Sequence, residues 1–208
     1  MVTEIGLRFP SSGRLAMSAA ADPNSSDDAL VLAAQQGDRA AFGILYSRYA
    51  RMLHGILLSR VSYADVDDLV QDVFLQALPR LGSLREVSRF PGWLAAIARN
   101  RASDFHRRSK PTDRLDDEPT ESAQNHPATS PRSHSGAEAR AALEAILSLP
   151  ETYRETLILR LVEGMTGPEI AARTGLTHGS VRVNLHRGMQ QLREILGRKA
   201  APLTGGEL

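Results

Sequence analysis

The feature that most constrains this fold is a pair of short amphipathic segments joined at a glycine, TGPEIAARTGLTHGSVRVNLHRGM, over residues 166–189. Thr166 can cap a first helix, because its hydroxyl can accept a hydrogen bond from an unpaired backbone N–H. Gly175 follows, and glycine is the residue best suited to a left-handed turn. Thr177 can then cap a second helix, whose apolar residues recur four positions apart. This order of caps, turn and apolar positions predicts a helix-turn-helix.

The second helix carries polar and basic side chains on its other faces, namely His178, Ser180, Arg182, Asn184, His186 and Arg187. Such side chains can reach base edges and phosphates in a DNA major groove. Residues 173–199 hold six basic residues and one acid, a local charge of +5 that would attract a phosphate backbone. A plain helical hairpin with a solvated basic face is the alternative, because glycine turns between amphipathic helices are common. The one-sided charge favours the DNA-binding interpretation.

Apolar residues recur at three- and four-residue intervals on both sides of a polar segment, which predicts an all-α protein with two small helical domains. The polar segment is rich in Pro, Ser, Thr and acids and carries a charge of −3, which is typical of a flexible linker. The predicted parts are an N-terminal tail (1–26), an N-terminal helical bundle (27–110), an acidic linker (111–135), a C-terminal four-helix domain that contains the helix-turn-helix (136–199) and a C-terminal tail (200–208).

Two predicted helices show which side chains should form the cores. The apolar stripe of the long helix after Gly37-Asp38 comprises Phe42, Leu45, Tyr46, Tyr49, Met52, Leu53, Ile56 and Leu57. In the C-terminal domain, the apolar side of the helix over residues 151–163 comprises Tyr153, Leu157, Leu161 and Val162. We interpret both sets as hydrophobic core, because the spacing matches one face of a helix.

The overall composition excludes several classes of protein. The chain has 208 residues, a net charge of +1 and no cysteine, which excludes disulfides and thiolate metal sites and fits a reducing cytoplasm. No apolar run approaches the length of a membrane span, and no signal-peptide core lies near Met1. We therefore expect a cytoplasmic protein that does not insert into a membrane, and no motif indicates a cofactor.

An acidic segment, SYADVDDLVQDVFLQAL, places Asp65, Asp67, Asp68 and Asp72 on one predicted helix. Carboxylates at helical spacing can hold a metal ion or perform acid–base chemistry. No His or Glu accompanies them, however, and acids are favoured at a helix N-terminus in any case. An acidic face that docks on a basic partner protein is the favoured interpretation.

A basic segment follows, with seven basic residues and two acids between residues 85 and 110. A Gly/Ser loop precedes a predicted helix that begins at Pro91, with Phe90 and Trp93 close by. A basic helix with aromatic residues can hold single-stranded nucleic acid through charge and base stacking. The alternative is that Phe90 and Trp93 belong to the hydrophobic core, and the pattern favours this alternative for Trp93.

These parts together resemble the bacterial RNA polymerase sigma factors of the extracytoplasmic-function (ECF) group. Four stretches carry the resemblance, in the order GDRAAFGILYSRY, DVDDLVQDVFLQAL, FPGWLAAIARNRASDFHRR and LPETYRETLILRLVEGMTGPEIAARTGLTHGSVRVNLHRGMQQLR. They cover about residues 27–110 and 136–199, which match regions 2 and 4 of that family. The four stretches in this order are far more specific than any one of them.

The resemblance implies a promoter-specificity subunit, not an enzyme, that binds core RNA polymerase and recognises the −10 and −35 promoter elements. The residues that match the segment bound by the clamp coiled coil of the largest polymerase subunit are Asp67, Asp68, Leu69, Gln71, Asp72 and Phe74. Those that match the loop and helix that capture the −10 element are Arg85, Arg89, Phe90, Trp93, Arg99, Asn100, Arg101, Asp104, Arg107 and Arg108. Those that match the helix that reads the −35 element are Thr177, His178, Gly179, Ser180, Arg182, Val183, His186 and Arg187.

The resemblance also implies partners beyond promoter DNA and the polymerase clamp. These are the polymerase flap and an anti-sigma protein, frequently membrane-anchored, which would hold a cytoplasmic chain at the membrane. Val183 and Asn184 differ from the small polar and basic residues that many relatives have there, so the promoter sequence stays open.

Two other functions fit parts of the pattern. A stand-alone helix-turn-helix regulator would bind a palindrome without polymerase and would need a dimerising or ligand-sensing N-terminal domain. A helical phosphohydrolase would use the carboxylates of residues 65–72, but the histidine partners of such a site are missing.

Overall fold

The computed structural model describes residues 22, 24–109 and 134–200, in which the chain forms eight α-helices, two short 3-10 helices and no strand. The N-terminal elements are α1 (Asp27–Gln35), α2 (Arg39–Leu58), α3 (Tyr63–Arg80), η1 (Leu81–Ser83), η2 (Val87–Arg89) and α4 (Phe90–Ser109). The C-terminal elements are α5 (His134–Leu147), α6 (Glu151–Leu161), α7 (Gly167–Thr174) and α8 (His178–Ala200). The all-α prediction is confirmed. The predicted tails and linker lie almost wholly outside the described residues.

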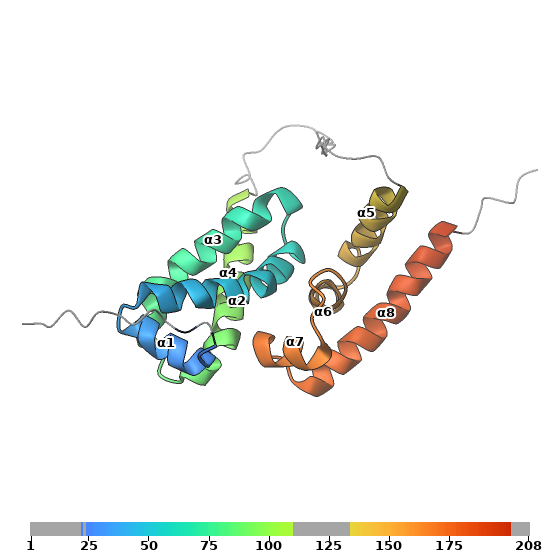
Figure 1. Cartoon of the computed structure of the whole chain (residues 1–208). Helices are drawn as coiled ribbons and strands as arrows, with labels where there is room; N and C mark the ends of the chain where they lie inside the picture. The colour runs from blue at the N-terminus through green and yellow to red at the C-terminus, as the bar shows by residue number, and fades with distance from the viewer. Residues whose placement is uncertain (1–21, 23, 110–133, 201–208) are drawn as a thin grey trace, which may run out of the picture.

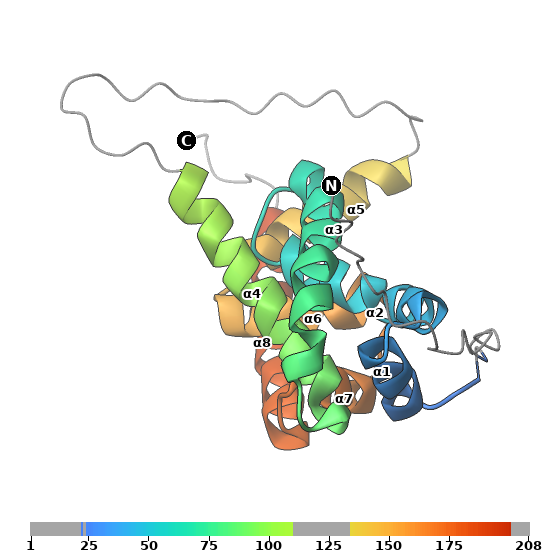
Figure 2. The same cartoon turned by 90° about the vertical axis from the view of Figure 1, so that its left-hand side faces the viewer.

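The N-terminal helices pack around α2, which contacts α1, α3 and α4 (Figure 2). Side chains cap the first two helices as their sequence suggests. The Ser26 hydroxyl accepts a hydrogen bond from the N–H of Ala29, and the Asp38 carboxylate accepts one from the N–H of Ala40 at 2.8 Å. Gly37 separates the two helices with a φ of 94°, which glycine adopts without steric cost.

The core stripe of α2 is largely where the sequence places it. The fully buried members are Leu45, Tyr49, Met52, Leu53, Ile56 and Leu57. Tyr46 is a correction, because 38% of it is exposed and its ring lies at the edge of the core, against the ring of Phe74. An aromatic residue at the border of an apolar stripe can keep one face in contact with the core and its hydroxyl in water.

The C-terminal helices pack around α6, which contacts α5, α7 and α8. Gly188 of α8 lies directly against α6, where an added Cβ atom would lie 3.0 Å from the Leu157 Cδ1 atom. On its opposite side α6 meets Gly55 of α2, where a Cβ atom would lie 2.7 Å from the Leu159 Cδ2 atom. The glycines at these two positions, one on α8 and one on α2, therefore let α6 approach both neighbouring helices closely.

The two groups of helices are in contact with each other. Figure 1 shows α6 and α7 between the N-terminal helices and α8, and the contacts that join the groups run from α2 to α6 and from α4 to α7. The α6 helix consequently buries five consecutive residues, Glu155, Thr156, Leu157, Ile158 and Leu159. A stretch of helix that is buried on all sides has no single apolar stripe.

This arrangement corrects the predicted core face of α6. Leu161 and Val162 are about half exposed, at 49% and 47%, whereas Ile158 and Leu159 are fully buried. The sequence pattern reports only one packing face, and α6 has a second face against the N-terminal helices. No helix in the described part of the chain is long and apolar enough to cross a membrane.

Candidate nucleic-acid interface

The helix-turn-helix forms from the caps that its sequence contains. The Thr166 hydroxyl accepts a hydrogen bond from the N–H of Glu169, and the Glu169 carboxylate accepts one from the N–H of Thr166 at 2.7 Å. This reciprocal pair is a capping box. Gly175 ends α7 in the left-handed region, with a φ of 77°. The Thr177 hydroxyl then accepts a hydrogen bond from the N–H of Ser180 at 3.1 Å and starts α8.

One face of the first half of α8 is buried and the other is open to solvent. Val181 is 1% exposed and packs in the core that includes Ile170 of α7. The open face carries Thr177, His178, Gly179, Ser180, Arg182, Val183, His186 and Arg187, all of which are exposed. Among the described residues, Arg182 and Arg187 form no ion pair, so both guanidinium groups are available to an anionic partner.

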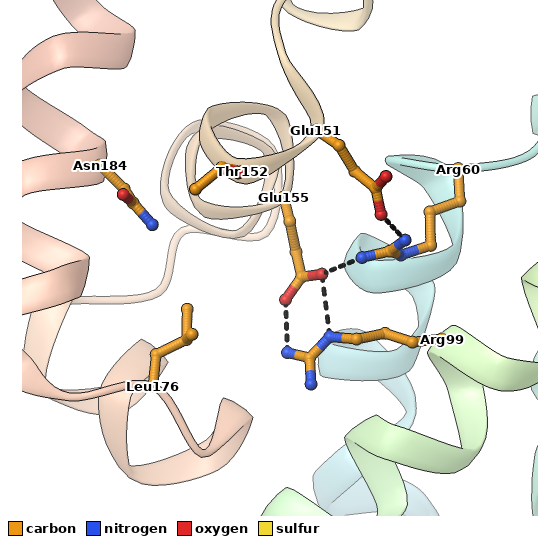
Figure 3. A pocket seen from close by; sticks show the side chains of 7 residues that line it. All are labelled: Arg60, Arg99, Glu151, Thr152, Glu155, Leu176 and Asn184. Carbon is orange, nitrogen blue, oxygen red and sulfur yellow. Dashed lines mark hydrogen bonds and ion pairs between the residues drawn. The ribbon is translucent and has the colours of Figure 1, made fainter.

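Asn184 does not belong to this open face, contrary to the sequence interpretation. It is only 8% exposed, and its side chain points from α8 toward α6 and the N-terminal helices (Figure 3). Asn184 lies three residues after the core residue Val181, and residues three apart share a face of a helix. The helix therefore presents Asn184 to the protein and not to DNA.

The basic surface around α4 contains both free and paired side chains. Arg85, Asn100 and Arg108 are exposed. Arg89 pairs with Glu86 at 2.5 Å, Arg101 with Asp72 at 2.6 Å, and Arg107 with Asp104. Arg99 points away from this surface, toward the C-terminal helices. The residues suggested for capture of the −10 element are thus divided between an exposed basic face and the domain contact.

The two aromatic residues of this segment differ in exposure. Phe90 is fully buried, with its ring 5.3 Å from the ring of Tyr49 in an edge-to-face arrangement. Trp93 is partly buried and packs beside Phe90, with 5.9 Å between ring centroids. In this arrangement Phe90 holds the start of α4 on the core, and Trp93 keeps part of its surface open to solvent.

The exposed face of α3 is acidic. Asp67, Asp68 and Gln71 are exposed, whereas Leu69 and Phe74 are each 3% exposed and belong to the core. The two buried residues therefore position the helix in this arrangement. Within the described residues, no group of three or more His, Asp or Glu side chains is placed to hold a metal ion.

A cavity of about 350 Å³ lies where the two groups of helices meet (Figure 3). Arg60, two residues after the end of α2, and Arg99 of α4 both point at Glu155 of α6. The Arg99 Nη2 and Nε atoms donate to the two Glu155 carboxylate oxygens at 2.6 and 3.1 Å, and the Arg60 Nη2 atom donates at 2.9 Å. Arg60 also pairs with Glu151.

The environment of Glu155 explains its charge state. Burial raises the pKa of this carboxyl, but the hydrogen bonds and charges of Arg99 and Arg60 outweigh burial and hold the pKa below its usual value. Glu155 is therefore ionised at neutral pH, as a buried acid can be when it is paired with cations.

A second carboxylate, that of Glu163 just after α6, also crosses to the N-terminal helices. The His54 Nδ1 atom lies 2.6 Å from the Glu163 Oε1 atom, and the Arg51 Nε atom lies 3.8 Å from the Oε2 atom. The Glu163 hydrogen bond raises the pKa of His54 above 6.5 despite partial burial, which lowers it, and Asp67 adds to the rise.

Sequence reasoning missed these contacts between the two groups of helices. The local pattern singles out neither Glu155 nor Glu163, and it favours a solvated position for Arg51. One available signal was the apolar run Leu157-Ile158-Leu159, which begins two residues after Glu155. Apolar residues on every side of a short helix indicate that a second neighbour covers it.

Comparisons with known proteins agree with this geometry. The family model for Sigma-70 region 2 matches residues 45–112, and the model for Sigma-70, region 4 matches residues 139–192. The first match covers most of α2 and all of α3 and α4, and the second ends within α8. Both regions are therefore present, in the order that the sequence suggests.

Full-length relatives extend the match. The "ECF RNA polymerase sigma-E factor" of Haemophilus influenzae is 32% identical over 187 residues, which covers 86% of this chain and 97% of that protein. The "RNA polymerase sigma factor CarQ" of Myxococcus xanthus is 32% identical over 164 residues, covering 78% of this chain and 93% of that protein. A solved structure of CnrH in complex with the cytosolic domain of CnrY has a TM-score of 0.59 at 25% identity, covering 85% of this chain and 100% of that one.

Proposed function

The chain belongs to the ECF group of bacterial RNA polymerase sigma factors, and from this membership we propose which of its surfaces bind the polymerase and which bind promoter DNA. It binds core RNA polymerase and directs promoter-specific initiation. A stand-alone helix-turn-helix regulator is not favoured, because the N-terminal helices match sigma region 2 and not a sensing domain.

We propose that residues 27–110 act as region 2 and residues 136–199 as region 4, joined by the segment 111–135. The observation that supports this division is the separation of charge over exposed surfaces. Asp67, Asp68 and Gln71 form an acidic face on α3, and α8 presents Arg182 and Arg187 without acidic partners among the described residues. Opposite charges favour opposite partners, a basic protein surface and a DNA backbone.

In this proposal the acidic face of α3 binds the clamp coiled coil of the polymerase, and the basic surface around α4 captures the −10 element. The exposed face of α8 reads the −35 element in the major groove, where arginine can donate two hydrogen bonds to guanine. The chain acts as an initiation factor and not as an enzyme. The wide distance between the two elements requires both DNA-binding surfaces to act from separate domains.

We further propose that the chain works in the cytoplasm and is regulated by an anti-sigma protein that can hold it at the membrane. Support comes from the related CnrH, whose solved structure is a complex with the cytosolic domain of CnrY. The polymerase flap is proposed as a second contact of the C-terminal domain.

The test of the polymerase assignment is co-elution of the purified chain with bacterial core RNA polymerase on gel filtration. We expect co-elution of the wild-type chain and its loss in Asp68→Arg, because the substitution reverses a charge on the proposed docking face. Asp28→Arg is the matched control, since Asp28 is an exposed acid on α1 and outside that face. Equal co-elution of all three chains would argue against the α3 face as the docking site.

A further inference from the structure

We propose that Arg60 and Arg99 form a binding site for a DNA backbone phosphate, and that Glu155 occupies this site while the two domains are docked. The proposal rests on the sigma-factor function above and adds Arg60 to the DNA-binding residues. It also makes the domain contact an autoinhibitory one, because the same guanidinium groups serve either the contact or the DNA.

The docked arrangement cannot engage both promoter elements at once. A Cβ atom on Gly92, at the start of α4, would lie 3.6 Å from the Cα atom of Gly175, the corner of the helix-turn-helix. The −10 and −35 elements are about 25 base pairs apart, hence on the order of 80 Å at ~3.4 Å per base pair. The domains that carry these two surfaces touch here, so they must separate when the promoter is bound.

The docked form is held by specific contacts. Besides the two pairs with Glu155, Arg99 donates to the Thr174 carbonyl at 3.2 Å, and Arg154 of α6 donates to the Ser59 carbonyl at 3.1 Å. Arg173 of α7 donates to the Arg48 carbonyl at 3.2 Å. Glu155 is 5% exposed, so its charge depends on the two arginines and not on water.

Separation leaves both arginines without a counter-charge. In the described part of the chain, the carboxylates that pair with Arg60 and Arg99 are Glu151 and Glu155, and both belong to α6. Both guanidinium groups bind the same oxygen of Glu155, so their nitrogen atoms lie close together. Two neighbouring cations repel each other unless an anion lies between them.

A phosphodiester fits this pair of cations. It carries a negative charge and oxygen atoms that accept hydrogen bonds from several N–H groups, and arginine binds phosphate and carboxylate with the same planar fork. Ser103 and His106 lie four and seven positions after Arg99, on the same side of α4, and His106 contacts the Arg60 carbonyl at 2.6 Å. Arg60 and Arg99 thus begin a polar track for a DNA strand, which continues along α4 through Ser103 and His106.

The consequence is an exchange of anions. DNA that enters the site replaces Glu155, so the loss of the domain contact is offset by new phosphate contacts. Binding of DNA and docking of the C-terminal domain are then mutually exclusive, and each weakens the other by the same factor.

The first experiment measures binding of the full-length chain to a fluorescent duplex of mixed sequence by anisotropy at low salt. Glu155→Gln leaves Arg99 without a carboxylate partner and Arg60 with Glu151 alone in the docked form. It should therefore favour the separated domains and raise DNA affinity about tenfold where docking is the dominant state. Glu144→Gln removes the same charge from an exposed position on α5 and should change affinity far less.

A second pair of variants opens the contact without changing any charge. Alanine at Gly55 would place its Cβ atom 2.7 Å from Leu159 and 2.8 Å from Glu163, so docking is hindered. Alanine at Gly43, on the same helix, meets no atom within 4 Å. We expect higher DNA affinity for Gly55→Ala and wild-type affinity for Gly43→Ala, and thermal melting checks that all variants remain folded.

The decisive variant is Arg60→Ala. It also removes a docking contact, but it should lower DNA affinity below that of the wild type and reduce the slope of log affinity against log salt by about one. If Arg60→Ala instead raises affinity as Glu155→Gln does, Arg60 serves docking alone and the phosphate site is wrong. Unchanged affinity in Glu155→Gln, or no DNA binding by any variant, also contradicts the proposal.

These outcomes are independent of the polymerase test. A chain that co-elutes with core polymerase but fails here contradicts only the phosphate site. A chain that fails to co-elute contradicts the proposed function itself.

Discussion

Arg182 and Arg187 are the single residues whose surroundings indicate most clearly what they bind. Both project from the exposed face of α8, and neither forms an ion pair with the described residues. An exposed arginine without a partner contributes little to stability but is available to a phosphate or a guanine edge. Their substitution should therefore affect DNA binding far more than folding.

We expect Arg182→Ala or Arg187→Ala to weaken binding of the holoenzyme to a promoter selected by the wild-type holoenzyme from a random library. The expected loss is about 1–3 kcal/mol where the contact is to a base, and it should respond to salt. Arg39→Ala is the control, because Arg39 is exposed at the start of α2, far along the chain from α8. Unchanged affinity in both α8 variants would exclude this face as the reader.

Single residues also show where sequence reasoning fails. The sequence pattern assigns Asn184 to the DNA-facing residues because it is polar, yet it is buried and points toward α6. The apolar spacing assigns Tyr46 to the core, yet 38% of it is exposed. Polarity and spacing define a face only approximately, and the neighbouring helices decide which residues at its border are covered.

At the scale of elements, α7 is a short helix that depends on its caps. It spans eight residues, a length at which isolated helices are unstable in water. The capping box at Thr166 and the left-handed Gly175 satisfy backbone groups at its two ends. These local devices explain why the helix-turn-helix was recognisable from the sequence alone.

We expect Thr166→Ala to lower the free energy of unfolding by about 1 kcal/mol, because it removes the hydroxyl that caps α7. Urea denaturation of the full-length chain measures the change. Thr166→Ser keeps the hydroxyl and should retain most of the stability. Equal destabilisation by both substitutions would show that the methyl group matters and not the cap.

The α6 helix is the element that links local structure to the arrangement of the whole chain. It has one side against α8, through Gly188, and another against α2, through Gly55. Its sequence predicts a helix correctly, but the predicted apolar side included the exposed Leu161 and Val162. A pattern with two buried faces cannot be resolved by a rule that assumes one.

At the scale of the whole molecule, the docked arrangement contains a titratable contact between the two groups of helices. Charged and aromatic groups from three elements surround His54 of α2. They are Glu163, just after α6, Arg51 of α2 itself, and Tyr63 and Asp67 of α3. The pKa of His54 is raised in this arrangement, mainly by the hydrogen bond to Glu163. The protonated form therefore stabilises the contact, because separation of the domains removes the Glu163 hydrogen bond that raises this pKa.

We expect this stabilisation to be fully present below pH 6.5 and to be lost as the pH rises through the raised pKa of His54. The fraction of docked molecules should fall over that range. It can be followed by energy transfer between dyes on Ser47→Cys and Gln190→Cys, because the chain has no cysteine of its own. The exposed side chains at both positions tolerate labels.

His54→Gln provides the control for this pH dependence. Glutamine can still donate a hydrogen bond to Glu163 but does not titrate, so the change in docking over this range should disappear. A pH response that persists in His54→Gln would assign it to another group. Arg51 also faces Glu163, so docking itself should weaken and not vanish.

The sequence by itself determined the helices, the helix-turn-helix and the family, because these depend on signals within a few residues of one another. Caps, the glycine turn and three- to four-residue apolar spacing are local, and the exposed basic face of α8 follows from them. The acidic surface of α3 and the basic surfaces of α4 and α8 were likewise evident, because acidic and basic residues are concentrated in separate segments of the chain.

Only the tertiary structure decided how the two domains face each other. Arg60 and Glu155 are 95 positions apart in the chain, and His54 and Glu163 are 109 apart. Charged residues at such separations look alike in sequence whether they pair or remain in water. Their partners depend on the close approach of α6 to α2, and no local pattern contains that packing.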